Sequence, residues 1–232
     1  MNYKKIVEAT FIERPNRFIA YCKINEIIEK IHVKNTGRCR ELLIPNCTVY
    51  LEESDNPNRK TKYSLIAVQK GNRLINMDSQ VPNKVVQEAL INKTIVLPGL
   101  DEEITFIKSE KTYGNSRFDI YLESKNKKAF IEIKGVTLEE DGVVLFPDAK
   151  TERGVKHIKE LIEAKKDGYH SYIIFVVQMK NVKYFTPNIK MHKELGDALI
   201  EAQNLGVNIL AYDCEVTPNS IEVKDEVNVK LL

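Results

Sequence analysis

The sequence of 232 residues has no long apolar run and no closely spaced cysteine pair. The first sixteen residues carry charges every few positions, and no later segment approaches about 18 consecutive apolar residues, so we expect neither a secretory signal nor a membrane-spanning helix. The four cysteines lack a C-x-x-C spacing, which argues against a zinc site and fits reduced thiols. These absences predict a cytoplasmic protein with no membrane partner.

The charges are distributed unevenly along the chain. The sequence is 43% hydrophobic and 29% charged, as is typical of a globular protein, and its formal net charge is +2. Residues 1–98 hold 16 Lys and Arg against 10 Asp and Glu, whereas residues 99–232 hold 19 against 23. A basic part suits a polyanion and an acidic part suits a cation, although ordinary scatter of surface charge explains the difference equally well.

The hydrophobic pattern divides the chain into two domains. Residues 1–80 consist of short alternating runs separated by turn-forming residues, and about five strands in this length predict a small barrel of the OB type. Helical spacing first appears after Val81-Pro82-Asn83, behind an early proline. We therefore predict an OB-like DNA-binding domain over 1–80 and a second domain over 81–232.

The second domain shows alternating strand and helix patterns. The expected strands are 104–113, 117–122, 129–136, 172–178 and 207–212, and the expected helices are 151–166 and 192–205. The continuous apolar run in 172–178 is typical of a strand covered on both faces. The predicted fold class is therefore α+β with two domains, the second an α/β domain whose mixed sheet is flanked by helices.

Three charged residues in the middle of the chain are candidates for catalysis. In Phe130-Ile131-Glu132-Ile133-Lys134, the strand period of two places Glu132 and Lys134 on one face. A hairpin through the turn 124–128 would bring Asp119 close to both. Two neighbouring carboxylates repel each other unless a cation neutralises them, and Mg²⁺ or Mn²⁺ prefers oxygen ligands of this kind. Lys134 beside that metal can activate a water or stabilise charge on a phosphate.

Other residues extend this site. Glu110 is a third candidate metal ligand, although it can equally be a solvated glutamate at a strand end. Arg153 and His157 lie four residues apart on one helical face, so both can point toward one phosphate. A lone helix histidine is more often structural than catalytic. Thr151 or Asp148 can cap the N-terminus of this helix without any catalytic role.

Basic residues of the first domain are candidates for DNA contact. The segment Asn35-Thr36-Gly37-Arg38 offers a glycine turn whose N–H groups and neighbouring arginines can bind phosphate. A hairpin turn with solvated arginines explains the same pattern. We expect Tyr63 to be available for stacking on a base. The predicted DNA-binding residues are Lys34, Asn35, Thr36, Arg38, Arg40 and Lys60.

Several segments together resemble a known family. They are His32–Arg38, Val81-Pro82-Asn83, Tyr113–Asp119, Glu132–Leu138 and Phe146–Gly154 with His157. These segments are similar to those of the sugar fermentation stimulation protein A family, within the PD-(D/E)xK nuclease-like superfamily. The resemblance implies an OB-like N-terminal domain, a nuclease-like C-terminal domain, DNA binding without marked sequence preference and a regulatory role in bacterial sugar metabolism.

Two functions remain open at this point. The chain is either a DNA-binding protein that keeps a nuclease-like metal site without cutting, or a metal-dependent DNA nuclease that uses Asp119, Glu132, Lys134 and Arg153. An enzyme for a small phosphorylated metabolite is disfavoured because the sequence has no glycine-rich phosphate loop. The sequence does not predict the oligomeric state.

Overall fold

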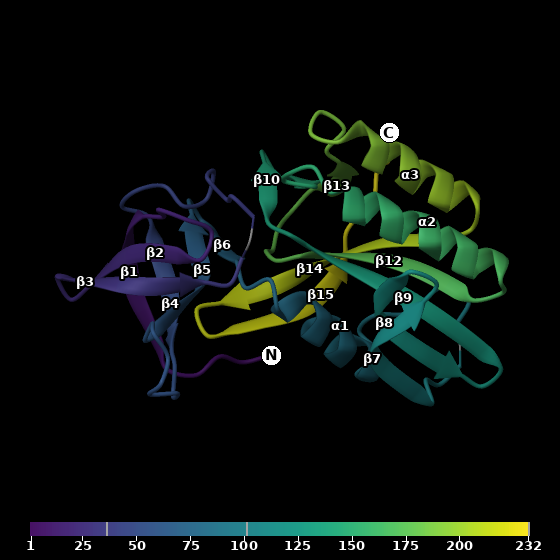
Figure 1. Ribbon diagram of the computed structural model, residues 1–232, viewed down its shortest axis with the longest axis horizontal. Helices are drawn as coiled ribbons and strands as arrows, with labels where there is room; N and C mark the ends of the chain where they lie inside the picture. Colours follow the sequence, from purple (N-terminus) through teal and green to yellow (C-terminus); the bar gives the residue numbers. More distant parts are fainter. Residues whose placement is uncertain (36, 101, 232) are drawn as a thin grey trace.

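The computed structural model describes residues 1–35, 37–100 and 102–231, which form a barrel followed by a second, mixed α/β domain (Figure 1). The barrel strands are β1 (Ile6–Glu13), β2 (Ile19–Ile24), β3 (Ile27–Val33), β4 (Thr48–Glu53), β5 (Tyr63–Lys70) and β6 (Arg73–Asn76). They run in the order β3-β2-β1-β4-β5-β6, and a parallel pairing of β3 with β5 closes the barrel. This arrangement confirms the predicted OB-like domain.

The second domain is built on a six-stranded sheet in the order β15-β14-β12-β9-β8-β7. Its strands are β7 (Phe106–Tyr113), β8 (Ser116–Ser124), β9 (Lys127–Val136), β12 (His170–Val177), β14 (Asn208–Thr217) and β15 (Ser220–Glu226). Strand β12 is parallel to both of its neighbours, while the outer pairs are antiparallel, so the sheet is mixed as predicted.

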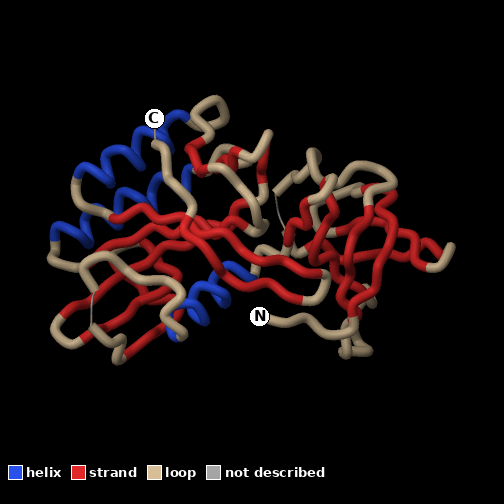
Figure 2. The backbone as a smooth tube through the Cα atoms, turned by 180° about the vertical axis from the view of Figure 1, so that it is seen from behind, coloured by secondary structure: helices blue, strands red, loops and turns tan. Residues whose placement is uncertain are grey.

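Three helices cover the two faces of this sheet. They are α1 (Val81–Ile91), α2 (Glu152–Lys166) and α3 (Lys193–Asn204). Figures 1 and 2 show α2 and α3 together on one face and α1 alone on the other. On the α1 side, Val85 packs in one apolar cluster with Ile131, whereas on the α2 side Leu161 packs in another with Phe130. Burying both faces accounts for the continuous apolar pattern of β12.

The sequence patterns missed four strands of this domain. Strands β10 (Leu138–Glu140), β11 (Val143–Phe146) and β13 (Tyr184–Pro187) form a small separate sheet, and β15 was not predicted either. The first three have only three or four residues each, too few for an alternating pattern to be distinguished from a loop. They matter because β10 and β11 lie beside the barrel.

The described helices are short, and the cysteines form no disulfide bonds. The three described helices have 11, 15 and 12 residues, and none of them is long and apolar enough to cross a membrane. All four cysteines are free thiols.

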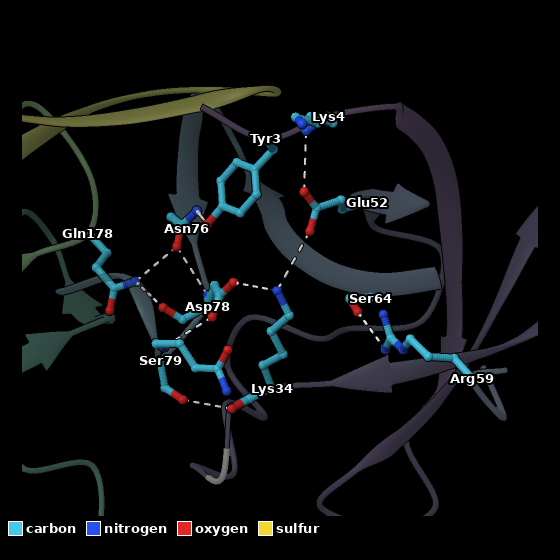
Figure 3. A network of polar contacts seen from close by, with 11 residues as sticks. Tyr3, Lys4, Lys34, Glu52, Arg59, Ser64, Asn76, Asp78, Ser79 and Gln178 are labelled. Atoms are coloured by element: carbon cyan, nitrogen blue, oxygen red, sulfur yellow. Dashed lines mark hydrogen bonds and ion pairs between the residues drawn. The ribbon is translucent and has the colours of Figure 1, made fainter. Parts of the chain in front are cut away.

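A buried polar network joins the barrel to the second domain (Figure 3). Gln178, directly after β12, donates from Nε2 to Asn76 Oδ1 at 2.9 Å and to the Asp78 carbonyl at 3.2 Å. Asn76 donates in turn to the Tyr3 hydroxyl at 2.8 Å, and Lys34 Nζ lies 2.8 Å from Asp78 Oδ2. Because Tyr3, Asn76, Asp78 and Gln178 are buried and hydrogen-bonded in this way, the network fixes the barrel against the sheet.

A second contact between the domains is ionic. Glu139 on β10 is 4% exposed and accepts from Lys70 Nζ at 2.7 Å, while Arg73 NH1 lies 2.7 Å from its other oxygen. Burial alone would raise the pKa of Glu139, but these two cations and the N–H of Gly142 lower it to about 2. The ionised form of Glu139 is therefore favoured in the folded protein.

Glu139→Gln is expected to lower the free energy of unfolding by about 3 kcal/mol at pH 7, because two cations lose their buried counter-charge. The stabilisation from Glu139 is fully present above its ordinary pKa of 4.5 and is lost as the pH falls toward about 2. The difference in the free energy of unfolding between wild type and variant, measured by urea unfolding, should therefore become smaller as the pH is lowered from neutral. A variant as stable as wild type at pH 7 would show that this contact contributes nothing.

Candidate metal and nucleic-acid site

The two central carboxylates come from adjacent strands. Strands β8 and β9 pair from Ser124↔Lys127 to Ile120↔Ile131, and one step further along the same register Asp119 lies opposite Glu132. The pairing ends there, and the Ile133 N–H donates instead to Asp119 Oδ2 at 2.8 Å. The predicted hairpin therefore does bring the two carboxylates together.

Helix α1 holds Asp119 from the other side. Asn83 in its first turn donates from Nδ2 to Asp119 Oδ1 at 2.9 Å. The close approach of α1 to β9 requires Gly135, because a Cβ there would lie 2.9 Å from Pro82 Cγ and 2.6 Å from Gln178 Oε1. Burial raises the pKa of Asp119, and the negative charge of Glu132 raises it further. The hydrogen bonds from the Ile133 N–H and from Asn83 lower this pKa, but they do not outweigh the first two effects. The negative charge of Asp119 is thus disfavoured in the protein alone.

Glu132 is held on one oxygen and free on the other. It is 2% exposed, and its Oε1 contacts Lys134 Nζ and lies 2.5 Å from His157 Nδ1. Burial works to raise the pKa of Glu132, but the hydrogen bonds and charges of His157 and Lys134 outweigh it and leave the pKa below its ordinary value. The second oxygen, Oε2, is buried and has no hydrogen-bond partner among residues 1–35, 37–100 and 102–231.

Arg153 determines the tautomer of His157. The Arg153 Nε–H donates to His157 Nε2 at 3.3 Å, so this ring nitrogen carries a lone pair and the ring proton is on Nδ1, facing Glu132. His157 is buried on α2 and also meets the Phe118 ring edge to face at 6.2 Å. In this arrangement His157 orients Glu132 rather than serving as a free base.

The donor set fits a divalent cation. An unpartnered buried carboxylate oxygen beside a second carboxylate whose ionisation is disfavoured is an arrangement that a hard cation would relieve. Among the residues that the structure describes, no group of three Asp, Glu, His or Cys side chains is close enough to hold a metal ion together. Asp119 and Glu132 would therefore share such an ion with waters or with a substrate phosphate.

Glu110, the third predicted ligand, is placed differently. It lies across from Asp119 in the β7–β8 register, but its side chain is exposed and its carboxylate is 3.3 Å from Arg117 NH2. Its backbone has a φ of +55°, a left-handed conformation that interrupts the regular strand. The structure therefore brings Asp119, Glu132 and Lys134 together. Glu110 lies on the neighbouring strand, opposite Asp119, but its carboxylate forms an ion pair with Arg117.

Thr151 begins the helix that carries Arg153. Its hydroxyl accepts from the Gly154 N–H at 3.0 Å, which confirms the predicted N-cap. Arg153 follows in the first turn with an exposed side chain. Lys84 on α1 and Arg117 on β8 are also exposed, next in sequence to Asn83 and two residues before Asp119. Exposed basic side chains thus lie close in sequence to Asn83 and Asp119, and Arg153 bonds to the histidine that holds Glu132.

In the barrel, Arg14 organises the predicted phosphate-binding turn. Its guanidinium donates to the carbonyls of Asn35, Gly37 and Arg38 at 2.6 to 2.9 Å and to that of Arg17 at 2.7 Å. Asn35 Oδ1 accepts from the Gly37 N–H at 2.8 Å, closing the turn. Thr36 lies outside the described residues. Arg14 was not among the predicted residues, because nothing in the local pattern indicates that it reaches a turn twenty residues away.

The predicted DNA-binding residues divide into two groups. Arg38, Arg40 and Lys60 are exposed, so a polyanion can reach them. Lys34 instead has a side chain only 17% exposed, 2.8 Å from Asp78 and 3.7 Å from Glu52 (Figure 3). The expectation that Tyr63 is available for stacking is wrong, since this residue is 7% exposed and packs in the barrel core.

Comparison with known proteins gives matches over nearly the whole chain. Residues 12–77 match the family model described as the SfsA N-terminal OB domain, and residues 80–220 match the sugar fermentation stimulation protein RE domain. Two sugar fermentation stimulation protein homologs are similar over the full chain. The one from Desulfitobacterium hafniense is 60% identical over 100% of this chain and 99% of its own, and the one from Clostridium beijerinckii is 57% identical over 100% of both.

A solved structure has the same fold. The structure of Pyrococcus furiosus SfsA in complex with Ca²⁺ superimposes with a TM-score of 0.88 at 30% sequence identity. The match covers 99% of this chain and 98% of that chain, so the arrangement of both domains is shared.

Proposed function

Since this chain belongs to the sugar fermentation stimulation protein family, we propose that it binds DNA with little sequence preference and holds a divalent cation between Asp119 and Glu132. The observation that carries the proposal is the buried, unpartnered Oε2 of Glu132 beside Asp119. Pyrococcus furiosus SfsA, whose structure is a complex with Ca²⁺, supports the binding of a divalent cation in this family. We propose Mg²⁺ or Mn²⁺ as the working metal here.

Hydrolysis of a DNA phosphodiester is the reaction that this site favours. A divalent cation bound here would supply a Lewis acid for the phosphate and an acidified water as nucleophile. The residues of the chain prepare the site before substrate arrives: the Ile133 N–H and Asn83 orient Asp119, while His157 orients Glu132. Lys134, at Glu132 and partly exposed, is placed to stabilise the negative charge that builds on the phosphate. Arg153 would bind the same phosphate through its two terminal nitrogens.

A DNA-binding protein that does not cut is the second candidate. The exposed arginines of the barrel favour it, because they supply binding energy by releasing counterions and need no metal. In such a protein the repulsion between Asp119 and Glu132 would serve no purpose. Cleavage assays with Lys134 variants distinguish the two candidates.

Arg38→Ala and Arg40→Ala are each expected to weaken DNA binding several-fold at low salt, by a similar factor for unrelated sequences. Each should also reduce the slope of log affinity against log salt by about 1, because one phosphate contact is lost. Fluorescence anisotropy of labelled oligonucleotides at several salt concentrations measures both quantities. The matched control is Lys23→Ala, at the β2–β3 turn, where the lysine pairs with Glu26 at 3.1 Å. Equal effects of all three substitutions would argue against a defined binding surface around Arg38.

A further inference from the structure

A cleft of about 200 Å³ lies between the barrel and the second domain, one residue removed from Asp119. Its lining includes Asn83 and Ile133, both of which donate hydrogen bonds to Asp119. A group held in the cleft would therefore be a close neighbour of any phosphate at Asp119 and Glu132.

The polar part of the cleft offers both a donor and an acceptor. Asn35 uses its Oδ1 to accept from the Gly37 N–H, which leaves its amide NH₂ as a donor. Asn83 uses its NH₂ on Asp119, which leaves its Oδ1 as an acceptor. An amide donor and an amide acceptor on facing domains match the mixed donor and acceptor edge of a nucleobase.

The apolar part of the cleft is a small platform on β10 and β11. Leu138 and Leu145 are cross-strand partners, so their side chains share one face; Phe146, the next residue of β11, also lines the cleft but belongs to the opposite face of the strand. All three are only half-buried, and the ring of Phe146 packs against that of Phe175, with ring centroids 5.5 Å apart. The face shared by Leu138 and Leu145 suits the flat side of a heteroaromatic ring.

The size of the cleft limits what enters. Its volume of about 200 Å³ has room for a group the size of a single base. The two domains are in contact at one side of the cleft, where Gly37 of the barrel packs against Asp148 of the second domain. The contact is so close that a Cβ on Gly37 would lie 2.5 Å from Asp148 Oδ2. A base must therefore leave its stack to enter.

We propose that this cleft holds one unpaired nucleobase of the strand whose phosphate lies at Asp119 and Glu132, which makes single-stranded DNA the preferred substrate class. The inference rests on the proposed function, because it requires that DNA occupies the neighbouring site. An intact duplex would first lose a few kcal/mol of pairing and stacking to present such a base, whereas a single strand presents it freely.

The test compares two single strands of about twelve nucleotides, one of thymidine and one whose sugars all lack a base. Binding is measured with Ca²⁺ in place of Mg²⁺ or Mn²⁺, so that a cation is present for the two carboxylates, and the strand lengths are checked afterwards to exclude cleavage. The ratio of the two affinities reports base contacts alone, since both strands have the same phosphates. Wild type is expected to prefer the thymidine strand by tenfold or more.

Leu138→Trp fills the cleft and should lower that ratio about tenfold, whereas Leu205→Trp, an exposed position at the end of α3, should leave it unchanged. Asn35→Asp provides a second variant, because it keeps the acceptor for the Gly37 N–H and removes only the amide donor. It should lower the ratio several-fold, and its added charge affects both strands alike.

The outcomes distinguish a failure of this inference from a failure of the proposed function. If Leu138→Trp and Asn35→Asp bind DNA with the wild-type ratio, the cleft holds no base and the inference is wrong, while the proposed function stands. If wild type binds neither strand, the proposed function fails and the inference fails with it.

Discussion

Asp119→Asn should remove most of the thermal stabilisation that Mn²⁺ or Mg²⁺ gives to the wild-type protein. At a hundredfold excess of metal over its dissociation constant, binding to the folded state alone adds about 2.7 kcal/mol, which corresponds to roughly 5–10 °C in melting temperature. The asparagine keeps the size of the side chain and an oxygen for the Ile133 N–H, but it removes the charge that attracts the cation. Without metal, the variant should melt no lower than wild type, because burial and Glu132 already disfavour that charge. Differential scanning fluorimetry with and without metal measures the metal-dependent shift in melting temperature and the melting temperature of each metal-free protein.

Two matched variants make this experiment specific. Asp141→Asn removes a charge from an exposed turn between β10 and β11, where the φ of +50° suits asparagine, and it should keep the full metal shift. Glu110→Gln tests the third predicted ligand; since Glu110 is exposed and paired with Arg117, we expect it to retain most of the shift. Equal metal shifts in wild type and Asp119→Asn would eliminate the site.

Lys134→Ala should reduce DNA cleavage by a factor of about 10² or more, with the affinities for DNA and metal nearly unchanged. The reason is that the ammonium of Lys134 touches Glu132 and, at 21% exposure of its side chain, reaches the site itself rather than the surrounding surface. Its contribution is therefore greatest when negative charge builds on the phosphate. The assay follows labelled single strands, duplexes and supercoiled plasmid under Mn²⁺, using identical preparations of both proteins.

Lys84→Ala is the control for this substitution. Lys84 is an exposed lysine of α1, next in sequence to Asn83, so its loss should weaken binding slightly and leave the rate at saturating DNA unchanged. Cleavage that survives in Lys134→Ala would indicate a contaminating nuclease. Wild type that cuts none of these substrates would favour the second candidate, a DNA-binding protein without nuclease activity.

The fold follows from the sequence wherever the hydrophobic pattern is long enough to be unambiguous. The alternation in β9 and the continuous apolar run of β12 predict the central sheet, and the spacing in 151–166 predicts α2 with its Thr151 cap. Strands of three or four residues escape detection, because their pairing depends on partners far along the chain. The parallel pairing of β11 with β13, for example, joins residues about forty positions apart.

The site shows the same limit. The two-residue period places Glu132 and Lys134 on one face, and a hairpin argument adds Asp119, because both depend on local geometry. The sequence did not predict the role of Lys34, whose part-buried ion pair is with Asp78, 44 residues away. The bond from Asn83 to Asp119, across 36 residues, was equally hidden, although the early proline beside Asn83 correctly predicted the helix that positions it.

The most direct measurement of the metal site is anomalous X-ray scattering from crystals soaked in Mn²⁺. The structure predicts one strong peak between Glu132 Oε2 and a carboxylate oxygen of Asp119, the two groups that would hold the ion. It also predicts that this peak disappears in Asp119→Asn crystals soaked in the same way. A saturated wild-type crystal with no peak between these two carboxylates, or with its strongest peak elsewhere, would contradict the proposed metal site.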